Sequence, residues 1–333
     1  LAEYYKLMEG VSMWDVAAQR QVEIKGQDSE RLIRYISPRN LKDCPIGKGK
    51  YTPICDHEGR LLNDPVVLRL SKQKFWLSIS DSDILLWVRA IAKERKYKVV
   101  VREPDVSPLA IQGPKAVEVV ADLFGDWIRN LKHFWFKETE LDGIPLVVAR
   151  SGWSKQGGFE LYLCDGTRGP TLWNKVKEAG KPYDIGPGAP NYIERLESGL
   201  LSFGADTHPD STPFEVGMDR WVDLDREDEF IGKQALIHHF KVGPKRKLIG
   251  VIFDGDPVTF NEHPWVARVD GTIAGTIRSV CYSPRRKSNI GFALLETKYT
   301  EIGTKLEFKG EGRSFKGEVV AQPLVGPTTT FLK

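Results

Sequence analysis

Hydrophobic and polar positions change their period along the chain and predict two kinds of region. Before residue 240, strand-like runs at residues 21–24 and 109–112 are each followed by a glycine and by a segment of helical periodicity. Apolar residues recur at helical spacing in both segments: Leu32, Ile33 and Ile36 in the first, and Val117, Val120 and Phe124 in the second. The repeated strand, glycine and helix suggests two related α+β halves.

The predicted helices carry recognisable end signals. Asp28 precedes the first helix and is expected to cap it, because an aspartate oxygen can accept a free N–H of the first turn. Pro114 is expected to begin the second helix. Further helices are predicted over residues 170–179, ending at Gly180, and around residues 194–201.

Residues 75–80 alternate and predict a strand between the two helical segments. Trp76, Ser78 and Ser80 share one face of this strand, while the apolar residues at 75, 77 and 79 share the other. One of the two faces is expected to belong to the core.

After Pro244 the pattern becomes one of short strands. Asp270-Gly271 is a strong hairpin signal within this region. The fold class is therefore α+β, with an α+β region of two interleaved subdomains over residues 1–240 and a barrel-like β domain over residues 245–333. The predicted strands are residues 248–253, 265–269, 272–281, 290–295 and 305–308.

Residues 150–162 combine a glycine-rich turn with aromatic rings and one carboxylate. Strand-like runs at 144–148 and 159–163 flank the turn, and Gly152, Gly157 and Gly158 suit its conformation. Glu160 and Tyr162 share one strand face, where a carboxylate can accept paired N–H donors from a ring edge. The pattern favours a site for a flat heteroaromatic ligand, and an ordinary hairpin with an exposed Glu160 is the alternative.

Asp64 is the candidate catalytic acid. It follows the apolar pair Leu61-Leu62 and precedes Pro65, which keeps the aspartate extended on a rigid, partly dry edge. An Asx turn without a catalytic role is the alternative.

Composition limits the classes of partner. The 333 residues are 41% hydrophobic, and 48 Lys and Arg against 45 Asp and Glu leave a net charge of +3, so neither nucleic acid nor an anionic membrane is expected. No apolar run approaches the length of a membrane span. Four cysteines without a Cys-x-x-Cys pair suggest reduced thiols in a cytoplasmic protein, and no metal site is expected. Because the chain does not begin with Met, we expect a fragment of a longer protein.

Several segments occur in the order found in folate-dependent aminomethyltransferases. They cover nearly the whole chain and include Gly158-Phe159-Glu160 and Arg195-Leu196-Glu197-Ser198-Gly199. Within this superfamily, residues 12–16, 20–24, 63–68 and 150–160 are most similar to the dimethylsulfoniopropionate demethylase branch. The superfamily segments are residues 51–67, 110–116, 158–160, 195–199, 230–236 and 279–284.

The resemblance implies a three-domain, cloverleaf-like fold in which tetrahydrofolate enters a central opening. It implies that Glu160 binds the amino and ring N–H groups of the pterin and that Asp64 faces the reactive folate nitrogen. Arg195 matches an arginine of the superfamily motif, although a buried Arg–Glu pair in a packed helix is an equal alternative. Trp14 or Trp153 is expected to attract a cationic substrate, with a core position as the alternative for either residue. The resemblance also implies that the folate or substrate cavity is lined by Tyr51, Ser78, Trp153 and Tyr162.

Two departures distinguish the chain from glycine-cleavage aminomethyltransferases. Asn63 stands where they have the first of two paired aspartates, and residues 153–156 replace their glycine-rich acidic turn. The resemblance therefore implies an enzyme that demethylates a small sulfonium acid, with dimethylsulfoniopropionate as the expected substrate and tetrahydrofolate as methyl acceptor. An aminomethyltransferase, another folate-dependent demethylase and a non-enzymatic folate-binding regulatory module remain alternatives, and a homodimer is left open.

Overall fold

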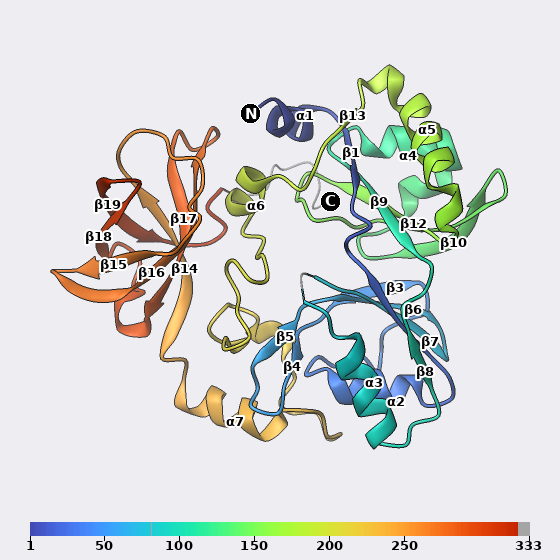
Figure 1. Cartoon of the computed structure of the whole chain (residues 1–333), viewed down its shortest axis with the longest axis horizontal. Helices are drawn as coiled ribbons and strands as arrows, with labels where there is room; N and C mark the ends of the chain where they lie inside the picture. The colour runs from blue at the N-terminus through green and yellow to red at the C-terminus, as the bar shows by residue number, and fades with distance from the viewer. Residues whose placement is uncertain (81, 326–333) are drawn as a thin grey trace. The chain divides into compact units, whose positions relative to one another are not determined.

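The computed structural model describes residues 1–80 and 82–325, which divide into two units (Figure 1). Among these residues, unit 1 contains 1–52 and 63–191, and unit 2 contains 53–62 and 192–325. The predicted boundary between residues 240 and 245 stays a prediction. No helix in the described part of the chain is long and apolar enough to cross a membrane.

The first sheet of unit 1 is six-stranded and mostly antiparallel, in the order β10-β11-β12-β9-β1-β13. Helices α4 (Ala116–Phe124) and α5 (Gly169–Gly180) pack on it through a core that includes Val120, Val176 and Phe159. The helix α1 (Ala2–Glu9) precedes β1. The strands are β1 (Ser12–Asp15), β9 (Ser107–Gln112), β10 (Phe136–Leu141), β11 (Ile144–Ala149), β12 (Gly158–Leu163) and β13 (Gly186–Pro187).

The second sheet of unit 1 is five-stranded, in the order β3-β6-β7-β2-β8. Helix α2 (Ser29–Ile36) packs on β2 and β7, and α3 (Leu85–Glu94) contacts β8. Residues 75–80 contribute a core face as predicted, and the opposite face of β7 is buried as well. One face contributes Trp76 to a core shared with Val147 and Tyr162 of the first sheet. The strands are β2 (Gln21–Lys25), β3 (Lys48–Tyr51), β6 (Val66–Ser71), β7 (Lys74–Ser78) and β8 (Val100–Arg102).

Each sheet contains one of the predicted strand, glycine and helix units. Gly26 lies between β2 and α2 and Gly113 between β9 and α4, both at positive φ (143° and 118°). A Cβ would come within 2.4 Å of the Lys98 carbonyl oxygen at Gly26 and within 2.5 Å of the Gly10 carbonyl oxygen at Gly113. Glycine therefore permits a close backbone approach at both places.

Asp28 precedes α2 as predicted, but the capping prediction was wrong. Its carboxylate accepts the backbone N–H of Lys98 (2.8 Å) and a bond from Arg31, and it makes no capping bond to the first turn of the helix. The close approach at Gly26 brings the residue 98 backbone to Asp28, and this amide takes the place of a helix N–H.

Unit 2 contains a closed barrel, as predicted, in the order β14-β17-β16-β15-β18-β19. Asp270 and Gly271 join β15 and β16 with positive φ at both residues, which confirms the hairpin. The last strand was not predicted, yet it closes the barrel by pairing with β14 and β18. The strands are β14 (Arg246–Phe253), β15 (Trp265–Val269), β16 (Thr272–Ser283), β17 (Ser288–Glu296), β18 (Lys305–Gly310) and β19 (Arg313–Val320).

Unit 2 also holds a short ribbon that interrupts the sequence of unit 1. Strands β4 (Ile54–Cys55) and β5 (Leu61–Asn63) pair with each other, and the Leu61 N–H donates to the Ser211 carbonyl at 2.8 Å. The helices of unit 2 are α6 (Tyr192–Ser198) and α7 (Lys233–Val242), and His239 of α7 contacts the Glu58 carbonyl of the ribbon at 2.8 Å. The chain thus leaves unit 1 after Thr52 and returns to it at Asn63.

Candidate functional site

Glu160 is a buried carboxylate with an unused oxygen. The strand β12 presents Glu160 and Tyr162 on one face, with 5% and 1% of each residue exposed. Ser151 Oγ and Tyr162 Oη, the latter at 3.1 Å, both donate to Oε2 of Glu160. Its Oε1 has no hydrogen-bond partner among the residues that the structure describes. The alternative of an exposed glutamate was wrong, and one acceptor is available to a ligand.

The surroundings of Glu160 determine its protonation. Burial raises the pKa of Glu160 above its ordinary value, and the donors Ser151 and Tyr162 oppose this effect in part. Burial and the neighbouring Glu160 raise the pKa of Tyr162 well above its usual range, so Tyr162 remains a donor. A ligand that offers further N–H groups to Glu160 would stabilise the carboxylate.

Ser78 and Gln21 extend this polar cluster into the second sheet of unit 1. Ser78 Oγ lies 3.5 Å from Tyr162 Oη and accepts a bond from Gln21 Nε2 at 3.1 Å. Gln21 Nε2 also donates to the Gln19 carbonyl at 2.8 Å, whereas Gln21 Oε1 is buried and has no partner among the described residues. Gln21 was not predicted as a site residue. The available signal was its place in a predicted strand with Glu23, two residues away on the same face.

The turn before Glu160 is held by Gln112 of β9. Gln112 Nε2 donates to the Ser151 carbonyl at 3.0 Å, and Gln112 Oε1 accepts from Ser154 Oγ at 2.8 Å. The Gln112 side chain occupies the space that a Cβ would need at Gly152. Trp153 lies between these anchors and is partly exposed.

Asp64 lies in a second cluster, at the point where the chain returns to unit 1. Only 8% of the residue is exposed, and its carboxylate accepts bonds from Tyr51 Oη (2.5 Å) and Ser80 Oγ. The predicted residues Tyr51 and Asp64 are therefore in direct contact. Ser80 was not proposed as a site residue, although its shared strand face with Ser78 was predicted.

Asn63 fixes the geometry of this second cluster. Its Nδ2 donates to the Ser82 carbonyl at 2.7 Å, and its Oδ1 accepts the Ser80 N–H at 3.1 Å. An aspartate at position 63 would place a carboxylate oxygen against the Ser82 carbonyl. The two clusters meet along one segment, because Ser78 belongs to the Glu160 cluster and Ser80 to the Asp64 cluster.

Two other predicted residues, Arg195 and Trp14, are buried and form hydrogen bonds with neighbouring residues of the protein. Arg195 is buried in unit 2 and donates to Asp206 (2.5 Å) and Ser279 (3.1 Å), which corresponds to the buried-pair alternative with an aspartate as partner. Trp14 is 1% exposed in a small core of unit 1, and its indole N–H donates to Ser12 at 2.7 Å. Their proposed roles in binding stay predictions.

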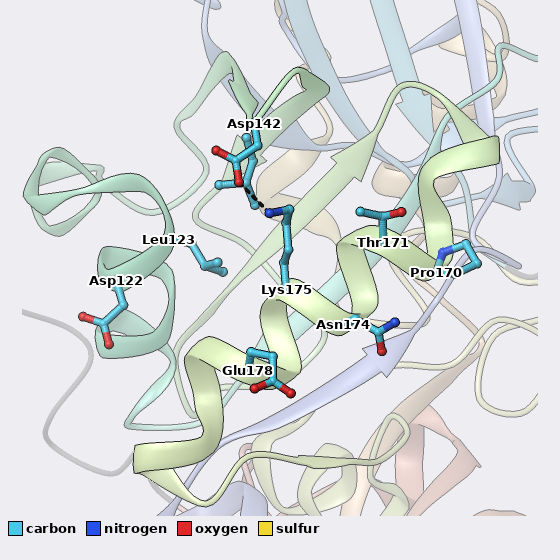
Figure 2. Close-up of a pocket in the computed structure, with 9 residues that line it drawn as sticks. Asp122, Leu123, Asp142, Pro170, Thr171, Asn174, Lys175 and Glu178 are labelled. Carbon is cyan, nitrogen blue, oxygen red and sulfur yellow. Dashed lines mark hydrogen bonds and ion pairs between the residues drawn. The ribbon is translucent and has the colours of Figure 1, made fainter.

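An open pocket of about 700 Å³ lies elsewhere on unit 1, between α4, α5 and the turn that joins β10 to β11 (Figure 2). Figure 2 shows Lys175 reaching toward Asp142, with which it forms an ion pair at 2.5 Å. The other residues that line this pocket include Asp122 and Glu178, and none of the lining residues is a predicted site residue. We therefore place the candidate site at the two buried clusters, the first of which has oxygens of Glu160 and Gln21 without a partner among the described residues.

Comparison with known proteins agrees with this fold. Residues 1–226 match the GCVT N-terminal domain, and residues 246–325 match the glycine cleavage T-protein C-terminal barrel domain. The crystal structure of glycine cleavage system aminomethyltransferase T from Bartonella henselae has a TM-score of 0.87 at 21% identity, covering 98% of this chain and 90% of the other. The predicted aminomethyltransferase fold with a C-terminal barrel is confirmed.

Sequence relatives include both predicted branches of the superfamily. Dimethylsulfoniopropionate demethylase DmdA of Ruegeria pomeroyi is 40% identical over 306 residues, covering 92% of this chain and 83% of the relative. An aminomethyltransferase of Caldanaerobacter subterraneus subsp. tengcongensis is 30% identical, covering 96% of this chain and 86% of the relative. The expectation of a tetrahydrofolate-dependent one-carbon transferase is confirmed. The chain belongs to the glycine cleavage T-protein family.

Proposed function

We propose that the protein transfers a methyl group from dimethylsulfoniopropionate to tetrahydrofolate, giving methylmercaptopropionate and 5-methyltetrahydrofolate. The observation that carries the proposal is the 40% identity to a dimethylsulfoniopropionate demethylase over 92% of the chain. Aminomethyltransferase relatives are 28% to 30% identical to this chain. The demethylase branch is therefore the better match.

The Glu160 cluster suits the pterin of tetrahydrofolate. The exocyclic amino group and the neighbouring ring N–H of a pterin form a pair of donors that one carboxylate can accept. Glu160 offers a buried carboxylate with a free Oε1, held in orientation by Ser151 and Tyr162. The residues present therefore fit this ligand, and Glu160 is its proposed anchor.

The transfer itself needs alignment more than acid–base chemistry. Tetrahydrofolate supplies the N5 lone pair that forms the new N–C bond, while the C–S bond breaks and leaves its electron pair on sulfur. The proton displaced from N5 passes to solvent. In this proposal Asp64 lies beside the reacting groups, where its negative charge stabilises the cationic donor and the positive charge that develops on nitrogen. Tyr51 and Ser80 hold the carboxylate in one orientation.

Asn63 supports methyl rather than aminomethyl chemistry. Its amide donates to a backbone carbonyl and accepts a backbone N–H, a combination that an ionised aspartate cannot provide. One carboxylate therefore remains at this place, where glycine-cleavage aminomethyltransferases are expected to have two. Trp153, partly exposed in the turn before β12, offers an aromatic face for a sulfonium, a contact worth about 0.5 to 2 kcal/mol.

The test supplies tetrahydrofolate with one donor at a time and identifies the folate product by mass spectrometry. The donors are dimethylsulfoniopropionate, dimethylglycine and an aminomethylated carrier protein. We expect 5-methyltetrahydrofolate with the sulfonium donor alone. Methylene folate formed only with the carrier protein would contradict the demethylase proposal. Folate binding without any product would favour the regulatory-module alternative.

A further inference from the structure

Gln21 is a buried amide whose two ends have different surroundings. The Gln21 residue is 1% exposed, and its Nε2 donates to the Gln19 carbonyl and to Ser78 Oγ. Its Oε1 is buried without a hydrogen-bond partner among the described residues. A buried acceptor without a partner costs roughly 1 to 3 kcal/mol, so such an atom in a native fold calls for an explanation.

The amide of Gln21 cannot turn over to remove this cost. A turned amide would place Oε1 against the Gln19 carbonyl, which is an acceptor and is now 2.8 Å from Nε2. The backbone therefore fixes the orientation of the side chain. Position 21 can offer an acceptor to a ligand, but it cannot offer a donor.

Glu23, two residues along β2, is the matched comparison. It is buried on the same face, but its carboxylate oxygens are used by the Trp76 indole N–H (3.0 Å) and by Arg102 (2.8 Å). The fold thus satisfies one buried acceptor of this face and leaves the other unsatisfied. A general looseness of hydrogen bonding on β2 does not account for Gln21.

The side chains of Gln21 and Glu160 are linked through Ser78 and Tyr162, by way of Gln21 Nε2 and Glu160 Oε2. Gln21 contacts Ser78, Ser78 contacts Tyr162, and Tyr162 donates to Glu160, at 3.1, 3.5 and 3.1 Å. The two unsatisfied acceptors therefore belong to one buried polar cluster, at separate ends of it. A flat ligand anchored at Glu160 by its amino edge would meet Gln21 with another part of the ring.

We propose that Gln21 Oε1 accepts a ring N–H that is present in tetrahydrofolate and absent from oxidised folate, so that Gln21 selects the reduced form. This inference rests on the proposed function. In both forms the amino group and the adjacent ring N–H face Glu160. Of the remaining ring nitrogens, N1 presents a lone pair in both forms, whereas N5 and N8 carry hydrogens in tetrahydrofolate but present lone pairs in oxidised folate. An acceptor that cannot turn over attracts the N–H groups of tetrahydrofolate and repels the lone pairs of oxidised folate.

The experiment compares the affinities of the full chain for tetrahydrofolate and folic acid by anaerobic calorimetry. We expect Gln21→Met to weaken tetrahydrofolate binding roughly 5- to 10-fold, the effect of one neutral hydrogen bond, without weakening folic acid binding. Glu160→Gln should weaken both ligands by the same factor. The exposed glutamine of the β6–β7 turn, Gln73, gives the matched control Gln73→Met, for which we expect no change.

A Gln21→Met variant that binds both ligands as the wild type does, or loses both equally, would overturn the inference, because a water or a structural role would then explain the free oxygen. If the wild type binds neither ligand, the proposed function itself fails. A second measurement needs no variant: of the 5-deaza and 8-deaza analogues of tetrahydrofolate, at least one should bind the wild type roughly 5- to 10-fold more weakly. Equal affinity for tetrahydrofolate and both analogues would also contradict the inference.

Discussion

Each unit buries a cluster of polar side chains, and the two clusters differ in how their carboxylates are neutralised. In unit 2, Arg195 pairs with Asp206, which also accepts from Ser279, while Glu197 pairs with Arg285. In unit 1, Glu160 is buried without a cation among its hydrogen-bond partners, and one oxygen of Glu160 and one of Gln21 lack described partners. A buried carboxylate paired with an arginine is therefore more readily explained by structure, whereas a carboxylate buried without a cation, in one cluster with an acceptor that lacks a described partner, is the better candidate for a binding site.

The largest expected effect tests the structural role of the unit 2 cluster. Arg195→Met leaves Asp206 buried without its cation and should lower the free energy of unfolding by about 3 to 5 kcal/mol. Chemical denaturation measures this loss, and Arg268→Met, at an exposed barrel position, is the control. If the variant keeps its stability but loses folate affinity, Arg195 is a ligand contact and the contrast between the clusters fails.

The next effect concerns catalysis in unit 1. Asp64→Asn keeps the shape of the side chain but removes the charge, so turnover should fall about 100-fold while folate affinity changes much less. Steady-state kinetics with a methyl-folate readout, combined with calorimetry, separates the two quantities. The exposed carboxylate of Asp142 provides the control Asp142→Asn. Unchanged turnover in Asp64→Asn would make Asp64 structural.

Glu160→Gln tests the unsatisfied acceptor directly. The variant should weaken tetrahydrofolate binding by roughly 1.5 to 3 kcal/mol, because charge-assisted hydrogen bonds are lost. Glu138→Gln alters an exposed glutamate of the same sheet and should leave the affinity unchanged. Calorimetry that finds equal affinities in a folded Glu160→Gln variant would remove Glu160 from the site.

The smallest expected effect is a pH dependence of stability in the absence of ligand. Because burial raises the pKa of Glu160 above 4.5, its favourable contribution to folding is complete below pH 4.5 and is lost as the pH rises through the folded-state pKa. The stability of the wild type relative to Glu160→Gln should therefore decrease as the pH rises over this window. Urea unfolding at several pH values measures it, and a difference that grows with pH would contradict the sign.

The alternation of side chains along predicted strands grouped the main residues of the candidate site correctly. Alternation in the strand after Gly158 placed Glu160 beside Tyr162, and the same rule grouped Ser78 with Ser80. The period could not show that both faces of β7 are buried, because the second face is covered by a sheet distant in sequence. It also could not distinguish Gln21 from Glu23, since the difference lies in their partners, Gln19 and Arg102.

Outside the site, too, local sequence patterns could not show features that depend on partners distant in the sequence. The five predicted barrel strands have clear apolar runs, whereas β19 contains Arg313, Lys316 and Glu318 and a central glycine, so its strand character depends on pairing with β14 and β18. Similarly, Asp206 forms its ion pair with Arg195 through the tertiary fold, and no spacing in the sequence indicates it.

The ribbon at residues 53–62 has a consequence for dividing the protein into fragments. A chain cut after residue 191 would separate unit 2 from a segment that supplies the hydrogen bond from Leu61 to Ser211 and the contact between Glu58 and His239. The C-terminal fragment would lack part of its own packing, and the N-terminal fragment would carry a ribbon without its partner. During folding, unit 2 is completed only after residues 53–62 have met the part of the chain that follows residue 191, which closes a long loop. The two units are therefore expected to fold together and to be retained together in evolution.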